Sequence, residues 1–242
     1  MDRLARLIDF NVMMDHPVYP EESTPDTILR VLAEDRVERA VIGNARPLAS
    51  LDFDTANGVT ADLVSRHREK VTGLALVNPQ NAEQVNRALN LGLKGIKLYP
   101  NFIWIRYGPL VEPAVQNVVR RNGIIHFSVS PERVGNMRFC AEVCAHFPEA
   151  RVIMGQIWNP WSWNPATILA KRYDNLLLEI GCVVPRLLED ALKVLGPSRF
   201  IVGSGLPYSR PAAVMDLLKR LQLSEDEIEQ IAFVNAARIL KE

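Results

Sequence analysis

Eight short runs of aliphatic residues recur along this sequence, and helical patterns separate them. The runs are rich in Val, Ile and Leu and show little apolar–polar alternation, which is typical of parallel strands buried on both faces. We expect strands at 7–12, 40–43, 72–77, 95–98, 123–128, 151–155, 176–180 and 200–203. Eight strand–helix units in 242 residues predict an α/β fold, the (β/α)8 or TIM barrel.

Residues that begin helices lie between the runs. The pairs at 24–25 and 164–165 combine Thr or Asn with Pro, as an N-cap and first helical residue do. Asn81 is a third expected N-cap. Ser224 with Glu227 predicts a capping box near the end of the sequence.

Length and composition favour one barrel domain over residues 1–242, because α/β barrels reach about 250 residues as a single domain. We find no linker and no low-complexity tract. An open doubly wound sheet is the structural alternative. It usually has a Gly-rich turn after its first strand, and residues 11–14 read Asn-Val-Met-Met.

The overall charge argues against two classes of partner. Basic and acidic residues number 28 each, so we expect neither a nucleic acid nor a membrane as partner. Lacking a secretory signal pattern, the sequence predicts a cytoplasmic protein. The three cysteines argue against a disulfide framework, and Cys140 and Cys144 are expected to be buried as small hydrophobes.

Four segments at predicted strand ends resemble the metal-dependent amidohydrolases of amidohydrolase family 2. The segments are LIDFNVMM (7–14), GIIHFSVS (123–130), RVIMGQIW (151–158) and RFIVGSGLP (199–207). The corresponding family motifs read IDxHxH, IHxG, AHxG and GSDxP. Residues 73–101 and 234–240 resemble the family's GxKLHPN and NAxRLL stretches. Motifs in this order, over most of the sequence, imply the family's barrel fold.

The resemblance also implies a divalent metal, yet most of the ligands differ. Asn11 and Met13 replace the two histidines of the first motif. Gln156 replaces a histidine and Gly205 the aspartate, so that only His126 is retained. An amide is a poor ligand for a transition metal, and a thioether suits soft ions. We therefore predict no catalytic metal and no other cofactor.

Two residues are candidates for catalysis. His126 has an ordinary pKa near 6.5, which suits proton transfer, although a hydrogen-bonded core histidine is an equal alternative. Lys97 lies in the apolar segment GIKLYP and needs either a carboxylate partner, for which Glu179 is available, or a lowered pKa. A lysine with a lowered pKa could form a Schiff base. A structural Lys–Glu pair, or a lysine that points to solvent, is the alternative.

The resemblance places further residues at the catalytic end of the barrel. We expect a small-molecule site lined by Asn11, Met13, Tyr99, Gln156, Trp158 and Ser204. The stretches 99–107 and 158–165, expected to be loops, contain all four tryptophans. They could line a pocket, form a contact in a homo-oligomer, or cover the barrel mouth.

Two functional classes remain open. The first is an amidohydrolase-like enzyme, a metal-independent hydrolase or related lyase acting on a small carbonyl or carboxylate substrate. The second is a non-catalytic protein with a ligand-binding or partner-regulating role. A carboxylate bound against His126 and Lys97 would favour the first class, and a mouth filled by tryptophans the second.

Overall fold

The strands lie where the aliphatic runs predict them. A computed structural model describes residues 6–99, 106–129, 135–157, 160–181 and 183–241. The strands are β1 (Ile8–Met14), β2 (Arg39–Asn44), β3 (Val71–Gly73), β4 (Ala75–Leu76), β5 (Gly95–Leu98), β6 (Ile124–Ser128), β7 (Arg151–Gly155), β8 (Leu176–Ile180) and β9 (Phe200–Val202). β3 and β4 are two parts of the third predicted strand.

These strands form a closed parallel barrel. Neighbours pair in sequence order from β1 to β3 and from β4 to β9. Leu74 joins β3 to β4, and its N–H donates to a β2 carbonyl at 2.9 Å. The barrel closes where the segment after β9 meets β1. There, Met13 donates its backbone N–H to the Leu206 carbonyl, and Gly205 donates to the Asn11 carbonyl, each at 2.8 Å. The prediction of a (β/α)8 barrel is confirmed.

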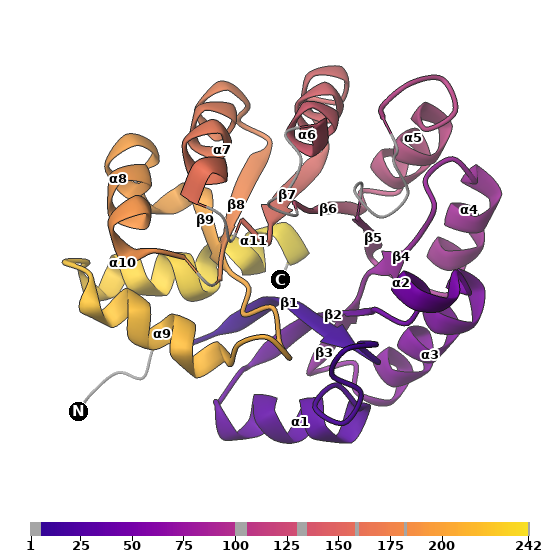
Figure 1. Ribbon diagram of the computed structural model, residues 1–242, viewed down its shortest axis with the longest axis horizontal. Helices are drawn as coiled ribbons and strands as arrows, with labels where there is room; N and C mark the ends of the chain where they lie inside the picture. The colour runs from indigo at the N-terminus through magenta and orange to yellow at the C-terminus, as the bar shows by residue number, and fades with distance from the viewer. Residues whose placement is uncertain (1–5, 100–105, 130–134, 158–159, 182, 242) are drawn as a thin grey trace.

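Helices surround the barrel, as Figure 1 shows for α3 to α8. The helices are α1 (Pro25–Glu34), α2 (Pro47–Ser50), α3 (Phe53–Arg66), α4 (Ala82–Asn90), α5 (Glu112–Arg120), α6 (Gly135–His146), α7 (Pro160–Arg172), α8 (Pro185–Leu195), α9 (Pro211–Arg220), α10 (Glu225–Glu229) and α11 (Asn235–Leu240), with the short segments η1 (Pro197–Arg199) and η2 (Gln230–Val234). None of the helices in the described residues is long and apolar enough to cross a membrane.

Three of the predicted helix starts are confirmed. The side chains of Thr24 and Asn81 cap α1 and α4, and Ser224 forms a capping box with Glu227 at α10. The predicted start at 164–165 is wrong, because α7 begins at Pro160 and Pro165 lies inside it. Proline fits the first turn, where its missing N–H would have no partner. The sequence holds two such prolines, and the earlier one begins the helix.

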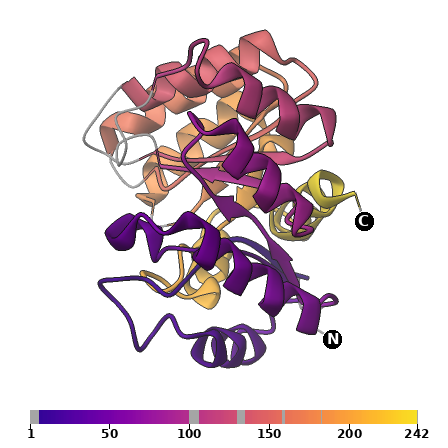
Figure 2. The ribbon, with the colours of Figure 1, turned by 90° about the vertical axis from the view of Figure 1, so that its right-hand side faces the viewer.

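Apolar packing occurs in two layers. The larger cluster lies between the strands and the surrounding helices and includes the buried, free Cys140 and Cys144; Cys182 lies outside the described residues. A smaller cluster fills the barrel interior and includes Ala236 and Ala237 of α11. Helix α11 therefore covers the amino-terminal end of the barrel, on the right in Figure 2. The Asn235 side chain fixes this helix by donating to the Phe200 carbonyl at 2.8 Å.

Candidate functional site

The barrel interior changes from apolar to polar along its axis. Ile124 of β6 and Leu177 of β8 belong to the interior apolar cluster. His126 and Glu179 follow two residues later on the same strands, so they face the same side of the sheet. Both are fully buried. A charged layer therefore lies directly above the apolar layer, toward the carboxyl ends of the strands.

An extra residue in β1 directs two predicted site residues into this layer. The register between β1 and β2 shifts between Asp9 and Val12. Phe10 belongs to the interior cluster, whereas Val12 belongs to the outer one. The bulge thus moves the inward-facing set from even to odd positions. Asn11 and Met13 consequently point inward.

Four buried side chains form a continuous set of hydrogen bonds, which we call the interior network: Lys97, Asn11, Glu179 and His126. The Lys97 ammonium donates to the Asn11 amide oxygen. Asn11 Nδ2 then donates to Glu179 Oε1 at 2.7 Å. The second carboxylate oxygen, Oε2, lies 2.5 Å from His126 Nε2. Lys97 and Glu179, for which the sequence suggested a direct pair, are therefore connected through Asn11.

Glycines on neighbouring strands provide the space for this network. A β-carbon at Gly155 or at Gly203 would overlap the Glu179 carboxylate. A β-carbon at Gly43 would lie 3.4 Å from Cδ of Lys97. The Glu179 side chain therefore fits inside the barrel because positions 155 and 203 have no side chain, whereas a β-carbon at Gly43 would make only an ordinary contact with Lys97.

Burial and neighbouring carboxylates have opposite effects on the pKa values of Lys97 and His126. Burial lowers the pKa of the Lys97 ammonium to about 8, against the upward effect of the Glu179 and Asp9 charges. Lys97 is therefore mainly charged at pH 7. Burial also lowers the pKa of His126, while the charge and hydrogen bond of Glu179 raise it. Glu179 thus favours a protonated imidazole in a site that otherwise disfavours one.

Asp9 is a buried acid that the sequence reasoning missed. Its carboxylate accepts from the Ser204 hydroxyl at 2.5 Å, from Ser204 N–H at 2.9 Å and from Asn11 N–H at 3.1 Å. Burial raises the pKa of Asp9 to about 6, although these hydrogen bonds oppose the rise. Ser204, expected to line the ligand site, connects the segment after β9 to β1. A charged residue inside the apolar run LIDF was the available signal.

Met13, Tyr99 and Gln156 meet in a second group. The Tyr99 hydroxyl contacts Met13 Sδ at 2.7 Å, and Gln156 Nε2 lies 3.5 Å from both of these atoms. Gln156 has a positive φ of 56°, and its N–H approaches Glu179 Oε1 at 3.4 Å. The Lys97 ammonium lies 5.7 Å from the centroid of the Tyr99 ring. This group is therefore in contact with the interior network.

The structure brings seven of the eight predicted site residues into one region. His126, Lys97 and Asn11 share the interior network, Met13, Tyr99 and Gln156 adjoin it, and Ser204 reaches it through Asp9. Trp158 lies outside the described residues.

His16, in the segment after β1, is buried against aromatic rings. Its Nδ1 accepts from Val18 N–H at 3.2 Å, so Nε2 carries the hydrogen and lies 2.9 Å from the Tyr208 hydroxyl. Burial lowers its pKa, and the charge of Lys97 acts in the same direction.

The second tryptophan-rich stretch, 158–165, differs from the loop that the sequence predicts, whereas most of the first stretch, 99–107, lies outside the described residues. Residues 160–165 form the first turns of α7, and Trp163 packs in the outer apolar cluster. Trp161 is 82% exposed. Trp104 and Trp158 lie outside the described residues. In the helix that begins at Pro160, Trp161 therefore faces solvent and Trp163 faces the core.

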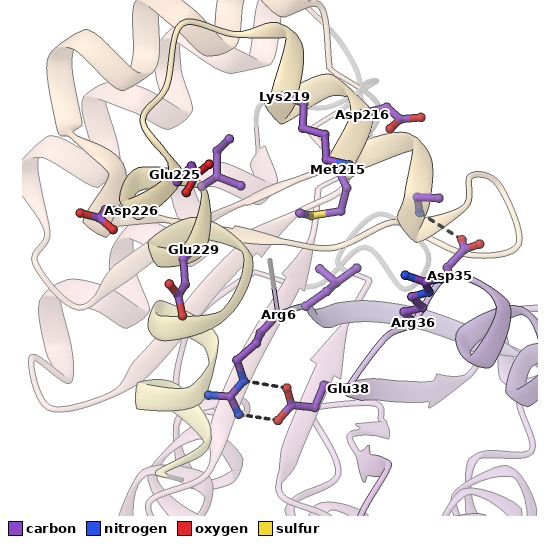
Figure 3. A pocket seen from close by; sticks show the side chains of 13 residues that line it. Arg6, Asp35, Arg36, Glu38, Met215, Asp216, Lys219, Glu225, Asp226 and Glu229 are labelled. Atoms are coloured by element: carbon purple, nitrogen blue, oxygen red, sulfur yellow. Dashed lines mark hydrogen bonds and ion pairs between the residues drawn. The ribbon is translucent and has the colours of Figure 1, made fainter. Parts of the chain in front are cut away.

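A separate cavity of about 770 Å³ lies near the amino ends of β1 and β2 (Figure 3). It is bounded by α9 and α10, and Asp216, Asp226 and Glu229 contribute acidic side chains. Arg6 and Glu38 form a two-point ion pair on its wall, at 2.8 and 2.5 Å. The interior network lies at the carboxyl ends of the strands, so the two features belong to opposite ends of the barrel.

The amidohydrolase sequence profile matches residues 5–241. The chain belongs to the amidohydrolase family. No curated protein matches its sequence.

Solved structures of decarboxylases share the fold of this amidohydrolase. 5-Carboxyvanillate decarboxylase from Sphingomonas paucimobilis has 16% identity and a TM-score of 0.74, over 98% of this chain and 99% of that one. 2,6-Dihydroxybenzoate decarboxylase from Rhizobium has 14% identity and a TM-score of 0.75, over 98% and 99%. A dihydroxybenzoic acid decarboxylase from Polaromonas, with bound manganese and the inhibitor 2-nitroresorcinol, has 15% identity and a TM-score of 0.78, over 98% and 97%.

The side chains at this site do not form a set of ligands for the divalent ion that the family's motifs imply. Within the described residues, no three His, Cys, Asp or Glu side chains converge as metal ligands. The amide oxygen of Asn11 accepts a hydrogen bond from the Lys97 ammonium, and His126 Nε2 is paired with the Glu179 carboxylate. Asp9 is directed to Ser204. The donors that remain, Met13, Gln156 and Nδ1 of His126, bring no negative charge to a divalent ion, and the Met13 thioether suits soft ions.

Proposed function

We propose that this amidohydrolase is a metal-independent lyase or hydrolase for a small carbonyl or carboxylate compound, with His126 as its proton-transfer group. The observation that carries the proposal is the 2.5 Å contact between His126 Nε2 and Glu179, at the end of the barrel where such enzymes act. The carboxylate fixes the orientation of the ring and stabilises its protonated form. Nδ1, which has no hydrogen-bond partner among the described residues, is left to exchange a proton.

Proton transfer to carbon fits these residues better than hydrolysis does. Hydrolysis needs a base for water, and Gly205 stands where the family's aspartate would act. Asp9, the nearby carboxylate, is engaged with Ser204. In a decarboxylation, the carbon–carboxylate bond breaks, carbon dioxide leaves, and the electron pair on carbon takes a proton, here from His126. The decarboxylases that share the fold suggest hydroxybenzoates as first compounds to test.

The experiment uses metal-stripped wild-type protein in the presence of EDTA. We would offer 2,6-dihydroxybenzoate, 5-carboxyvanillate, and small lactones and esters, and follow carbon dioxide and products by chromatography. We expect turnover of a carboxylate, and a loss of roughly 100-fold or more in His126→Asn. His146→Asn, an exposed histidine on α6, is the matched control and should keep the wild-type rate. Activity that needs added manganese, or that survives in His126→Asn, would contradict the proposal.

The non-catalytic alternative is favoured by one observation. His126 has no exposed surface, and Lys97 is only 3% exposed. A network this deeply buried can serve as a charged core beneath a ligand-binding surface. Under this alternative, compounds from the same panel raise the melting temperature without being converted. His126→Asn would then lower the stability without changing the affinity.

A further inference from the structure

Two buried carboxylates and one buried ammonium meet inside this barrel. Asp9 is 0% exposed, Glu179 is 2% exposed and Lys97 is 3% exposed. The charges of both acids act on the Lys97 ammonium. A buried charge without a neighbour of opposite sign is costly, so the Lys97 ammonium and the Glu179 carboxylate, which Asn11 connects, stabilise each other.

We infer that the Lys97 ammonium is the resident cation of this barrel, taking over the charge-neutralising role of the divalent ion that the family's motifs imply. The inference concerns how the site is built, and it does not depend on the proposed reaction.

The position of the ammonium supports this reading. Lys97 reaches Asn11, which stands at the first ligand position of the family motif, and donates to its amide oxygen. The same amide also binds the carboxylate, because its nitrogen donates to Glu179. An amide suits this place, since it offers an acceptor to the cation and a donor to the carboxylate.

The surroundings of the lysine side chain are adapted to hold it. Its methylene groups pack closely against β2, since a β-carbon at Gly43 would lie at contact distance, 3.4 Å, from Cδ. The Tyr99 ring lies on the ammonium at 5.7 Å, a distance at which an aromatic face stabilises a cation. The lysine side chain therefore lies between the β2 backbone, an aromatic ring and an amide.

A double-mutant cycle tests the inference by stability. We would measure melting temperatures of the wild type, Lys97→Met, Glu179→Gln and the double variant at pH 7.5. Removing one partner of a buried charge pair should lower the melting temperature by on the order of 10 °C. The double variant should lose clearly less than the sum of the two single losses. Lys94→Met, an exposed lysine three residues earlier, is the control and should change little.

The pH dependence separates charge from packing. Asp9 is mainly protonated at pH 5, because burial raises its pKa to about 6. The loss in melting temperature caused by Lys97→Met should therefore be smaller at pH 5 than at pH 7.5. If Lys97→Met lowers the melting temperature equally at both pH values, and the losses of the two single variants add up in the double variant, Lys97 only fills space and the inference is overturned.

Metal analysis provides an independent outcome. After incubation with manganese or zinc chloride and gel filtration, wild-type protein should retain only substoichiometric metal. A stoichiometric ion in the wild type would mean that the resident cation is a metal, which also overturns the inference. None of these measurements uses a substrate, so failure of the proposed reaction leaves them interpretable.

Discussion

The carboxylate of Glu179 lies in the space that a side chain at Gly155 would need. A β-carbon on Gly155 would overlap Glu179 Oε2 and would stand 2.8 Å from His126 Nε2. A β-carbon on Gly203 would overlap Cγ and Cδ of the same glutamate. Gly155 and Gly203, at either side of β8, thus leave the space that Glu179 occupies beside His126.

Adding a methyl group at either glycine should therefore destabilise the fold. We expect Gly155→Ala and Gly203→Ala each to lower the free energy of unfolding by about 2–3 kcal/mol, because a packed core cannot absorb the extra group. Gly58→Ala in α3 is the matched control, because a β-carbon there meets nothing within 4 Å. It should raise stability by about 0.5–1 kcal/mol. Urea unfolding measures all three, and equal effects at Gly155 and Gly58 would contradict the assignment.

Replacing Glu179 by glutamine should lower the pKa of His126. The carboxylate raises that pKa through its charge and its hydrogen bond, and glutamine keeps the shape without the charge. The protonated fraction of His126 at a given pH should therefore fall. Titration of the imidazole nitrogens by NMR measures the shift. Glu149→Gln, at an exposed acid after α6, should leave the His126 titration unchanged.

Asp9 should make the wild type less stable as the pH rises. Burial raises its pKa to about 6 in the folded protein, against an ordinary value of 3.8. The stability linked to this raised pKa is therefore present at low pH and is lost as the pH passes through about 6. Relative to Asp9→Asn, the wild type should lose on the order of 2 kcal/mol between pH 4.5 and 7.5. Urea unfolding at both pH values tests this, and a constant difference would contradict it.

Gln156 should accept glycine better than valine. Its φ of 56° lies in the left-handed region, where a β-branched side chain is strained and glycine is not. Gln156→Val should therefore be less stable than Gln156→Gly by on the order of 1–2 kcal/mol. Next to a barrel strand the opposite order is normal, so the sign of the difference is the test. Denaturant unfolding of the two variants provides it.

The order of strands and helices could be read from the sequence because local patterns carry it. All eight aliphatic runs became strands of the barrel, and the caps at Thr24, Asn81 and Ser224 formed as expected. Aliphatic runs and helix caps depend on residues close together in the sequence, so the amino-acid order is enough to find them. Pro160 and Pro165 show the limit, since two equivalent local signals competed and the pattern did not rank them.

The sequence by itself also determined which side chains stand at the strand ends. It led to His126 and Asn11 through the resemblance, and to Lys97 through its place in an apolar segment. Only the tertiary structure decided how they connect. The bulge in β1 turned Asn11 inward, and Asp9 met Ser204, which is 195 residues away. These contacts depend on strand register and on barrel closure, which bring together atoms from opposite ends of the chain. Distances of that kind have no signature in local sequence, whereas the tendency to form each strand and each cap does.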